Sequence, residues 1–143
     1  GVQAGRVRGR RAGMPTRPMT ADPERRLELK ATAGRLVVNI DVSQGGGQRR
    51  ARGRLKIEVP DSGRSLTVTE FGVLQVTGQW ASLTAQAKMK PEDQDRSVTV
   101  IVDRSDPLSA SGVSSLIVEV EGARAFRGDM PTAALKLTVA ARR

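Results

Sequence analysis

The sequence predicts an all-β domain, an antiparallel sandwich or barrel of about eight strands, and three observations indicate this. Apolar and polar residues alternate over long stretches, most clearly in residues 36–43 and 81–89. Since successive side chains of a strand point to opposite faces, this pattern is typical of sheets with one buried and one solvated face. Turn-forming residues separate these stretches at short intervals, and no long helical periodicity is present.

Eight segments carry the strand signal, and each ends at a recognisable turn. They are residues 35–43, 52–59, 65–69, 71–77, 80–90, 97–103, 116–121 and 134–140. Three glycines at 45–47 predict a flexible loop after the first segment, and Pro60-Asp61-Ser62-Gly63 predicts a turn after the second. Leu27 and Leu29 predict either a short strand or one helical turn. Residues 122–132 are expected to form a longer connection.

The chain divides into an extended basic arm, residues 1–24, and a single β-domain, residues 25–143. Proline, glycine and arginine dominate the arm, so it has little to bury. Of the 24 basic residues in the chain, which carries a net charge of +9, five lie in the first 19 positions, where no acidic residue occurs. These five are Arg6, Arg8, Arg10, Arg11 and Arg17.

The composition argues against most catalytic chemistry. The chain has no histidine, cysteine or tyrosine, which removes the commonest general base, the thiol nucleophile and the best soft metal ligands. Acidic residues gather at Glu92, Asp93 and Asp95, and again at Asp103 and Asp106, but neither spacing matches a twelve-residue calcium loop. We therefore expect a protein that is not an enzyme and uses no cofactor or metal.

Three stretches of the β-domain carry a resemblance to a known family. They are the glycine-led strand at Gly53, the hairpin that runs from Val73 through Gly78 and Trp80, and the Val-Thr-Val-Ile-Val-Asp strand at 98–103. Over about residues 36–120 the chain resembles the post-COAP-1-type β-domains of secreted bacterial proteins. The resemblance implies an extracytoplasmic β-domain, and it supplies no catalytic residues.

Clustered arginines are the first candidate binding residues. Beside those of the arm, Arg49, Arg50, Arg52 and Arg54 lie in and after the glycine loop, and alternation predicts that the last three share one strand face. Guanidinium groups on one face can hold phosphate or carboxylate. The partner could be an acidic protein surface, nucleic acid, anionic lipid or acidic polysaccharide.

Trp80 is the other candidate contact residue. With Phe71 and Phe126 it completes the aromatic residues of the chain, so the core must be aliphatic. At the start of the segment 80–90, a ring of this size could fill the end of a barrel, belong to the core, or contact a partner subunit.

These features predict a structural or accessory subunit of an exported or cell-envelope assembly. In this interpretation the β-domain packs on protein partners and the arm docks on a neighbouring subunit. The alternatives are a nucleic-acid-binding barrel that uses the arm and the four loop arginines, and a phage shell decoration-type protein; the scarcity of aromatics argues against a carbohydrate-binding module. The chain begins with glycine, so we expect removal of a signal peptide and an extracytoplasmic location.

Overall fold

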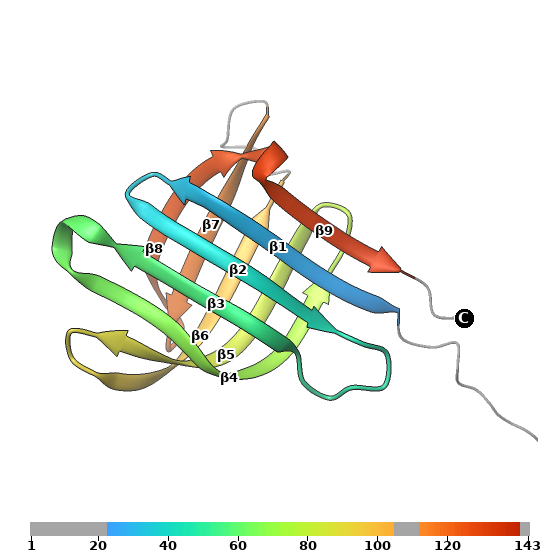
Figure 1. Ribbon diagram of the computed structural model, residues 1–143, viewed down its shortest axis with the longest axis horizontal. Coiled ribbons are helices and arrows are strands. Elements are labelled where there is room, and N and C mark those ends of the chain that lie inside the picture. Colours follow the sequence, from blue (N-terminus) through green and yellow to red (C-terminus); the bar gives the residue numbers. More distant parts are fainter. Residues whose placement is uncertain (1–22, 105–111, 141–143) are drawn as a thin grey trace, which may run out of the picture.

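The computed structural model describes residues 23–104 and 112–140, which form one antiparallel sheet curled into a nearly closed barrel (Figure 1). The strands of the first half are β1 (Glu24–Ala33), β2 (Leu36–Gln44), β3 (Arg52–Val59) and β4 (Arg64–Val76). Those of the second half are β5 (Trp80–Lys90), β6 (Gln94–Asp103), β7 (Val113–Val120), β8 (Ala123–Pro131) and β9 (Leu135–Ala140). Short 3₁₀ turns at Pro60–Ser62 and Thr132–Ala134 interrupt this meander. The expected all-β class is confirmed.

The strand order is β8-β7-β6-β5-β4-β3-β2-β1-β9, so each strand from β1 to β8 pairs with its neighbour in sequence. The chain then turns at Thr132–Ala134, and β9 pairs with the first half of β1, where Leu29 lies opposite Leu135. The second half of β1 lies against β8 instead. In Figure 1, β9, β1, β2 and β3 cover the near side, while β6 and β7 pass behind them. β8 and β9 are thus the two edge strands of the sheet, and Gly128 of β8 lies close to Ala33 at the end of β1.

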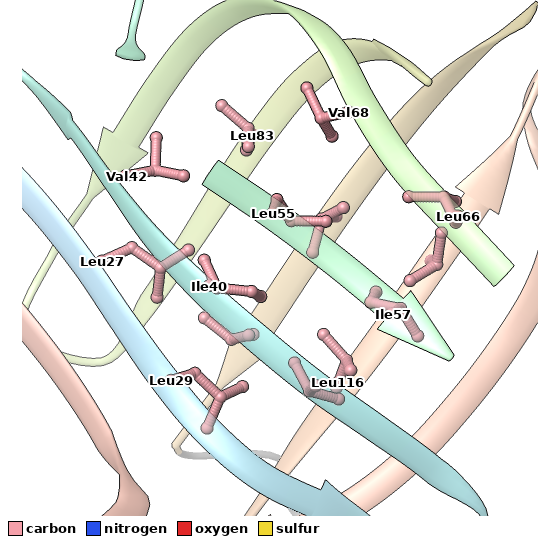
Figure 2. Close-up of a cluster of buried hydrophobic side chains, with 14 of the residues drawn as sticks. Leu27, Leu29, Ile40, Val42, Leu55, Ile57, Leu66, Val68, Leu83 and Leu116 are labelled. Atoms are coloured by element: carbon pink, nitrogen blue, oxygen red, sulfur yellow. The ribbon is translucent and has the colours of Figure 1, made fainter. Parts of the chain in front are cut away.

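Alternation places the aliphatic side chains inside the barrel. Ile40 of β2, Leu55 of β3, Leu83 of β5 and Leu116 of β7 are all essentially inaccessible to solvent and gather in one core (Figure 2). Every strand contributes to this core, because alternate residues along each one point inward. The barrel is therefore filled by its own side chains. Its charged side chains lie on the outer surface and at its ends.

Two sequence predictions about strands are wrong. The segments 65–69 and 71–77 form one strand, β4, which carries two register shifts against β5, one between Val68 and Glu70 and one between Phe71 and Leu74. These β-bulges interrupt the inward alternation, which made one strand resemble two. The predicted connection at 122–132 is the strand β8, in which Phe126, Gly128 and Met130 are buried at alternate positions.

The segment at Leu27 and Leu29 is a full strand, which settles the choice between strand and helical turn. Glu24, placed at the end of the arm by the sequence, is the first residue of this strand. The arm from residue 1 to 22 lies outside the described residues. Among the residues that are described, no helix has the length and apolar character needed to span a membrane.

Gln44 is a polar residue in this core, and its alanine variant should lose stability. It is 3% exposed, its Nε2 donates to the carbonyl of Gln48 at 2.7 Å, and its Oε1 accepts from the buried N–H of Leu74 at 2.9 Å. Gln44→Ala leaves that N–H without a partner, so the free energy of unfolding should fall by about 1–3 kcal/mol. Urea unfolding measures this, and the exposed Gln75→Ala is the matched control, expected to change stability little. Equal effects of the two variants on the free energy of unfolding would contradict this role of the Gln44 hydrogen bonds.

Candidate functional site

The outer face of β3 carries a row of cations. Arg52, Arg54 and Lys56 point outward and are exposed. Leu55, between Arg54 and Lys56, and Ile57, directly after Lys56, point into the core. Neighbours in this row are separated by two residues of an extended strand, or about 6.6 Å along the chain. The alternation that builds the core therefore also places three cations in a row, and this row ends at Glu58, whose Oε2 lies 3.9 Å from Nζ of Lys56.

The nearest carboxylate across the sheet is already bound by another residue. Asp41 of β2 lies opposite Arg54, but Arg26 of β1 binds it through Nη2, at 3.1 Å from Oδ1 and 3.3 Å from Oδ2. Arg52 lies opposite the neutral Ser43. Within the described part of the chain, neither Arg52 nor Arg54 forms an ion pair or side-chain hydrogen bond, so their guanidinium groups remain available.

The loop before β3 places its two arginines differently. Arg49 is exposed and without an ion-pair partner in the described residues, whereas Nη1 of Arg50 binds Oε2 of Glu70 on β4 at 2.7 Å. The prediction that Arg50 shares a strand face with Arg52 and Arg54 is wrong, because β3 begins only at Arg52. Arg50 instead ties the loop to β4.

Lysines on neighbouring strands extend the row. Lys30 of β1 lies opposite Asn39 of β2, which in turn lies opposite Lys56, and Lys136 of β9 lies opposite Glu28. We call the exposed set on this side the basic face, and it comprises Arg49, Arg52, Arg54, Lys56, Lys30 and Lys136. The three lysines were not among the predicted site residues. Lys56 follows Arg52 and Arg54 on the same face of β3, whereas Lys30 and Lys136 lie on other strands. The order β9-β1-β2-β3 brings them together.

Trp80 lies apart from the basic face. It begins β5, points outward and is 39% exposed, so it neither belongs to the core nor fills the barrel. Its backbone is fixed by Thr77, whose N–H donates to the Trp80 carbonyl and whose Oγ1 accepts from the Trp80 N–H at 3.0 Å. The interpretation as a partner contact stays a prediction. Phe71 is half-buried and Phe126 is buried.

The basic arm joins the barrel at the same end as the loop that carries Arg49. In the pairing of β1 with β2, Arg25 lies opposite Gln44, directly before that loop. Arg6, Arg8, Arg10, Arg11 and Arg17 themselves lie outside the described residues. The described part of the chain therefore begins beside the loop that carries Arg49.

The acidic turn between β5 and β6 is a small ion-pair cluster. Oδ1 of Asp93 lies 2.6 Å from Nζ of Lys90 and 4.0 Å from Nζ of Lys88. The hydrogen bond from Lys90 lowers the pKa of Asp93, and the charges of Lys88 and Lys90 lower it further. Searched over the described ranges, no three histidine, cysteine or carboxylate side chains come together in a way that could hold a metal ion.

Removing the Lys90 ammonium should raise the pKa of Asp93 toward its ordinary value. In the folded chain Asp93 stays ionised to a lower pH than in the unfolded chain, so this pair favours folding above the ordinary pKa and ceases to do so as the pH falls through the lowered one. An NMR titration of the Asp93 carboxyl in Lys90→Ala measures the shift. A larger shift in Lys88→Ala would contradict the assignment of the hydrogen bond as the main cause.

Comparison with known proteins gave no relative. No family model, no curated protein and no solved structure matches the chain. The resemblance to post-COAP-1-type domains therefore stays a prediction.

Proposed function

We propose that this chain is a non-catalytic accessory subunit of an exported or cell-envelope assembly, in which the outer surface of the barrel binds an acidic protein partner. The arm is proposed to dock on a neighbouring subunit from the end of the barrel beside Arg49. Contact through the outer surface is favoured because the barrel interior is filled by aliphatic side chains, which leaves little room there for a ligand (Figure 2).

One observation carries the proposal: Arg52 and Arg54 are exposed and unpaired among the described residues, although a carboxylate lies opposite one of them. Asp41 could neutralise Arg54, but Arg26 holds both of its oxygens. A guanidinium group binds carboxylates through two parallel hydrogen bonds, which gives direction as well as attraction. A partner with acidic side chains on an extended strand or loop would match the row on β3.

A nucleic-acid partner is the second candidate, and the regular spacing of Arg52, Arg54 and Lys56 favours it, since a phosphate chain is also a line of charges. Against it, the outer face of β3 carries no aromatic side chain on which bases could stack. A phage shell decoration-type role would use the same surface against a protein lattice. These candidates differ in whether the complex contains an acidic protein, a nucleic acid or the protein lattice of a shell.

Fractionation of the source cells tests the proposal. We expect the full chain to migrate in native electrophoresis as part of a large envelope complex that dissociates at high salt and is unchanged by nuclease. Mass spectrometry of that complex should identify a partner with an acidic surface. Migration as a free cytosolic chain would contradict the proposal, and a complex lost on nuclease treatment would replace it with nucleic-acid binding.

A further inference from the structure

A hollow lies on the outer face of β4, β5 and β6, away from the residues of β3. Its volume is about 360 Å³, within the usual range for small-molecule sites. Polar groups of Thr84, Gln86, Ser97 and Thr99 line it, together with Arg50 and the half-buried ring of Phe71. We propose that this hollow binds a neutral polyhydroxylated ligand, a saccharide. The proposal does not rest on the function proposed above.

The two β-bulges of β4 border this hollow. Between Phe71 and Leu74 the register against β5 shifts, and Gly72 within this shift lines the hollow. A Cβ atom at Gly72 would come within 2.5 Å of Oγ1 of Thr84, so the strands approach closely there. The loop before β3 holds the bulge from the other side, because the N–H of Ala51 donates to the Gly72 carbonyl at 2.7 Å. Bulges of this kind commonly shape functional sites.

The polar groups of the hollow are held in place by hydrogen bonds, and they can form further hydrogen bonds to a ligand. Nε2 of Gln86 donates to Oγ of Ser97 at 2.8 Å, which leaves the hydroxyl proton of Ser97 and the side-chain oxygen Oε1 of Gln86 available to a ligand. Oγ1 of Thr84 accepts from the N–H of Val73 at 3.1 Å, so its proton can still be donated. Thr99 lies beside Thr84 across the β5–β6 ladder. Hydroxyl and amide groups fixed in this way suit a ligand that both donates and accepts at several neighbouring positions.

The charges around the hollow balance, and this favours a neutral ligand. Glu70 binds Nη1 of Arg50 through Oε2 at 2.7 Å, and Glu121 binds Nη1 of Arg96 through Oε1 at 3.0 Å. Each pair leaves the second carboxylate oxygen free to accept a hydrogen bond from a ligand hydroxyl. A strongly anionic ligand would meet two carboxylates, whereas the hydroxyls of a sugar would meet acceptors and donors in turn. The half-buried ring of Phe71 supplies apolar surface for the C–H face of a sugar ring, so the low aromatic content of the chain does not exclude a saccharide at this place.

Titration of the isotope-labelled full chain with neutral disaccharides tests the proposal. With maltose, cellobiose, xylobiose and N,N′-diacetylchitobiose as separate probes, at least one should cause saturable shifts of the backbone amides of Gly72, Gln86, Ser97 and Thr99. Gln86→Ala and Thr99→Val should each weaken that binding about tenfold, which corresponds to one lost hydrogen bond. Ser82→Ala, on the outer face of β5 but outside the hollow, should leave it unchanged.

Three outcomes would overturn the proposal. They are no saturable shift with any of the four sugars at millimolar concentration, shifts confined to another surface, and equal effects of Ser82→Ala and Thr99→Val. Thr99→Val keeps the shape of the side chain and suits a strand, so it serves if Gln86→Ala fails to fold. A tighter response to an anionic sugar such as glucuronate would contradict the neutral ligand class.

Discussion

Replacing Gly128 by valine is expected to prevent the barrel from closing. Gly128 lies in β8 where this strand passes the end of β1, and a Cβ atom there would come within 2.3 Å of the Ala33 carbonyl oxygen and 2.9 Å of the Ala33 Cβ. The obstacle is backbone, so no side-chain rotation relieves it. Gly128→Ala should lower the free energy of unfolding by about 1–3 kcal/mol or more, and Gly128→Val should leave the chain largely unfolded.

Denaturant unfolding followed by circular dichroism measures both variants. Gly78→Ala is the matched control, because a Cβ atom at Gly78, in the turn between β4 and β5, meets nothing within 4 Å. It should unfold at nearly the wild-type denaturant concentration. A Gly128→Ala chain that unfolds at the wild-type midpoint would show that β8 and β1 do not come as close as the barrel requires.

Reversing the charge of Arg52 and Arg54 together is expected to abolish the proposed complex. Each arginine would contribute one charge-assisted contact of about 1.5–3 kcal/mol, so Arg52→Glu with Arg54→Glu should weaken partner binding by about 100-fold or more. Both side chains are exposed and unpaired in the described part of the chain, so the fold should be unaffected. Native electrophoresis of the complex, and titration of the purified partner, measure the loss.

The control for this experiment is a double variant with the same change in net charge at two arginines outside the basic face. Arg35, in the turn between β1 and β2, and Arg124, on β8, are exposed and lie away from the basic face. Arg35→Glu with Arg124→Glu should change binding only slightly, through long-range electrostatics that salt screens. If both double variants weakened binding equally, the attraction would come from total charge, and the row on β3 would have no special role.

Much of the fold could be predicted from the sequence, because period-two alternation directly reports which face of a strand is buried. It located β2, β3, β5 and β6 and the aliphatic core. It failed where the barrel needs irregular backbone. The bulges of β4 break the alternation between Val68 and Leu74, and β8 has glycine where alternation would place a large residue, because β1 leaves no room at Gly128.

The candidate site could be predicted only in part. Arg52 and Arg54 are two apart in a clear strand, so their shared face followed from the sequence alone. Lys30 and Lys136 joined them only once the strand order was known, because β9 is the last strand in the chain yet pairs with the first. The pairing of Arg50 with Glu70 joins residues 20 apart in the chain, so no local pattern revealed it. Trp80 points outward because Ala81 and Leu83 occupy the interior positions of β5.

The most direct test of the basic face as the binding surface is the chemical reactivity of the lysines in the free chain and in the isolated complex. All five lysines of the chain lie in described strands: Lys30, Lys56 and Lys136 on the basic face, and Lys88 and Lys90 on β5. Quantitative acetylation followed by mass spectrometry should show protection of Lys56 and Lys30 in the complex, with Lys90 reacting as in the free chain. Protection of Lys90 with full reactivity at Lys56 would contradict the proposal, because the partner would then contact another face of the barrel.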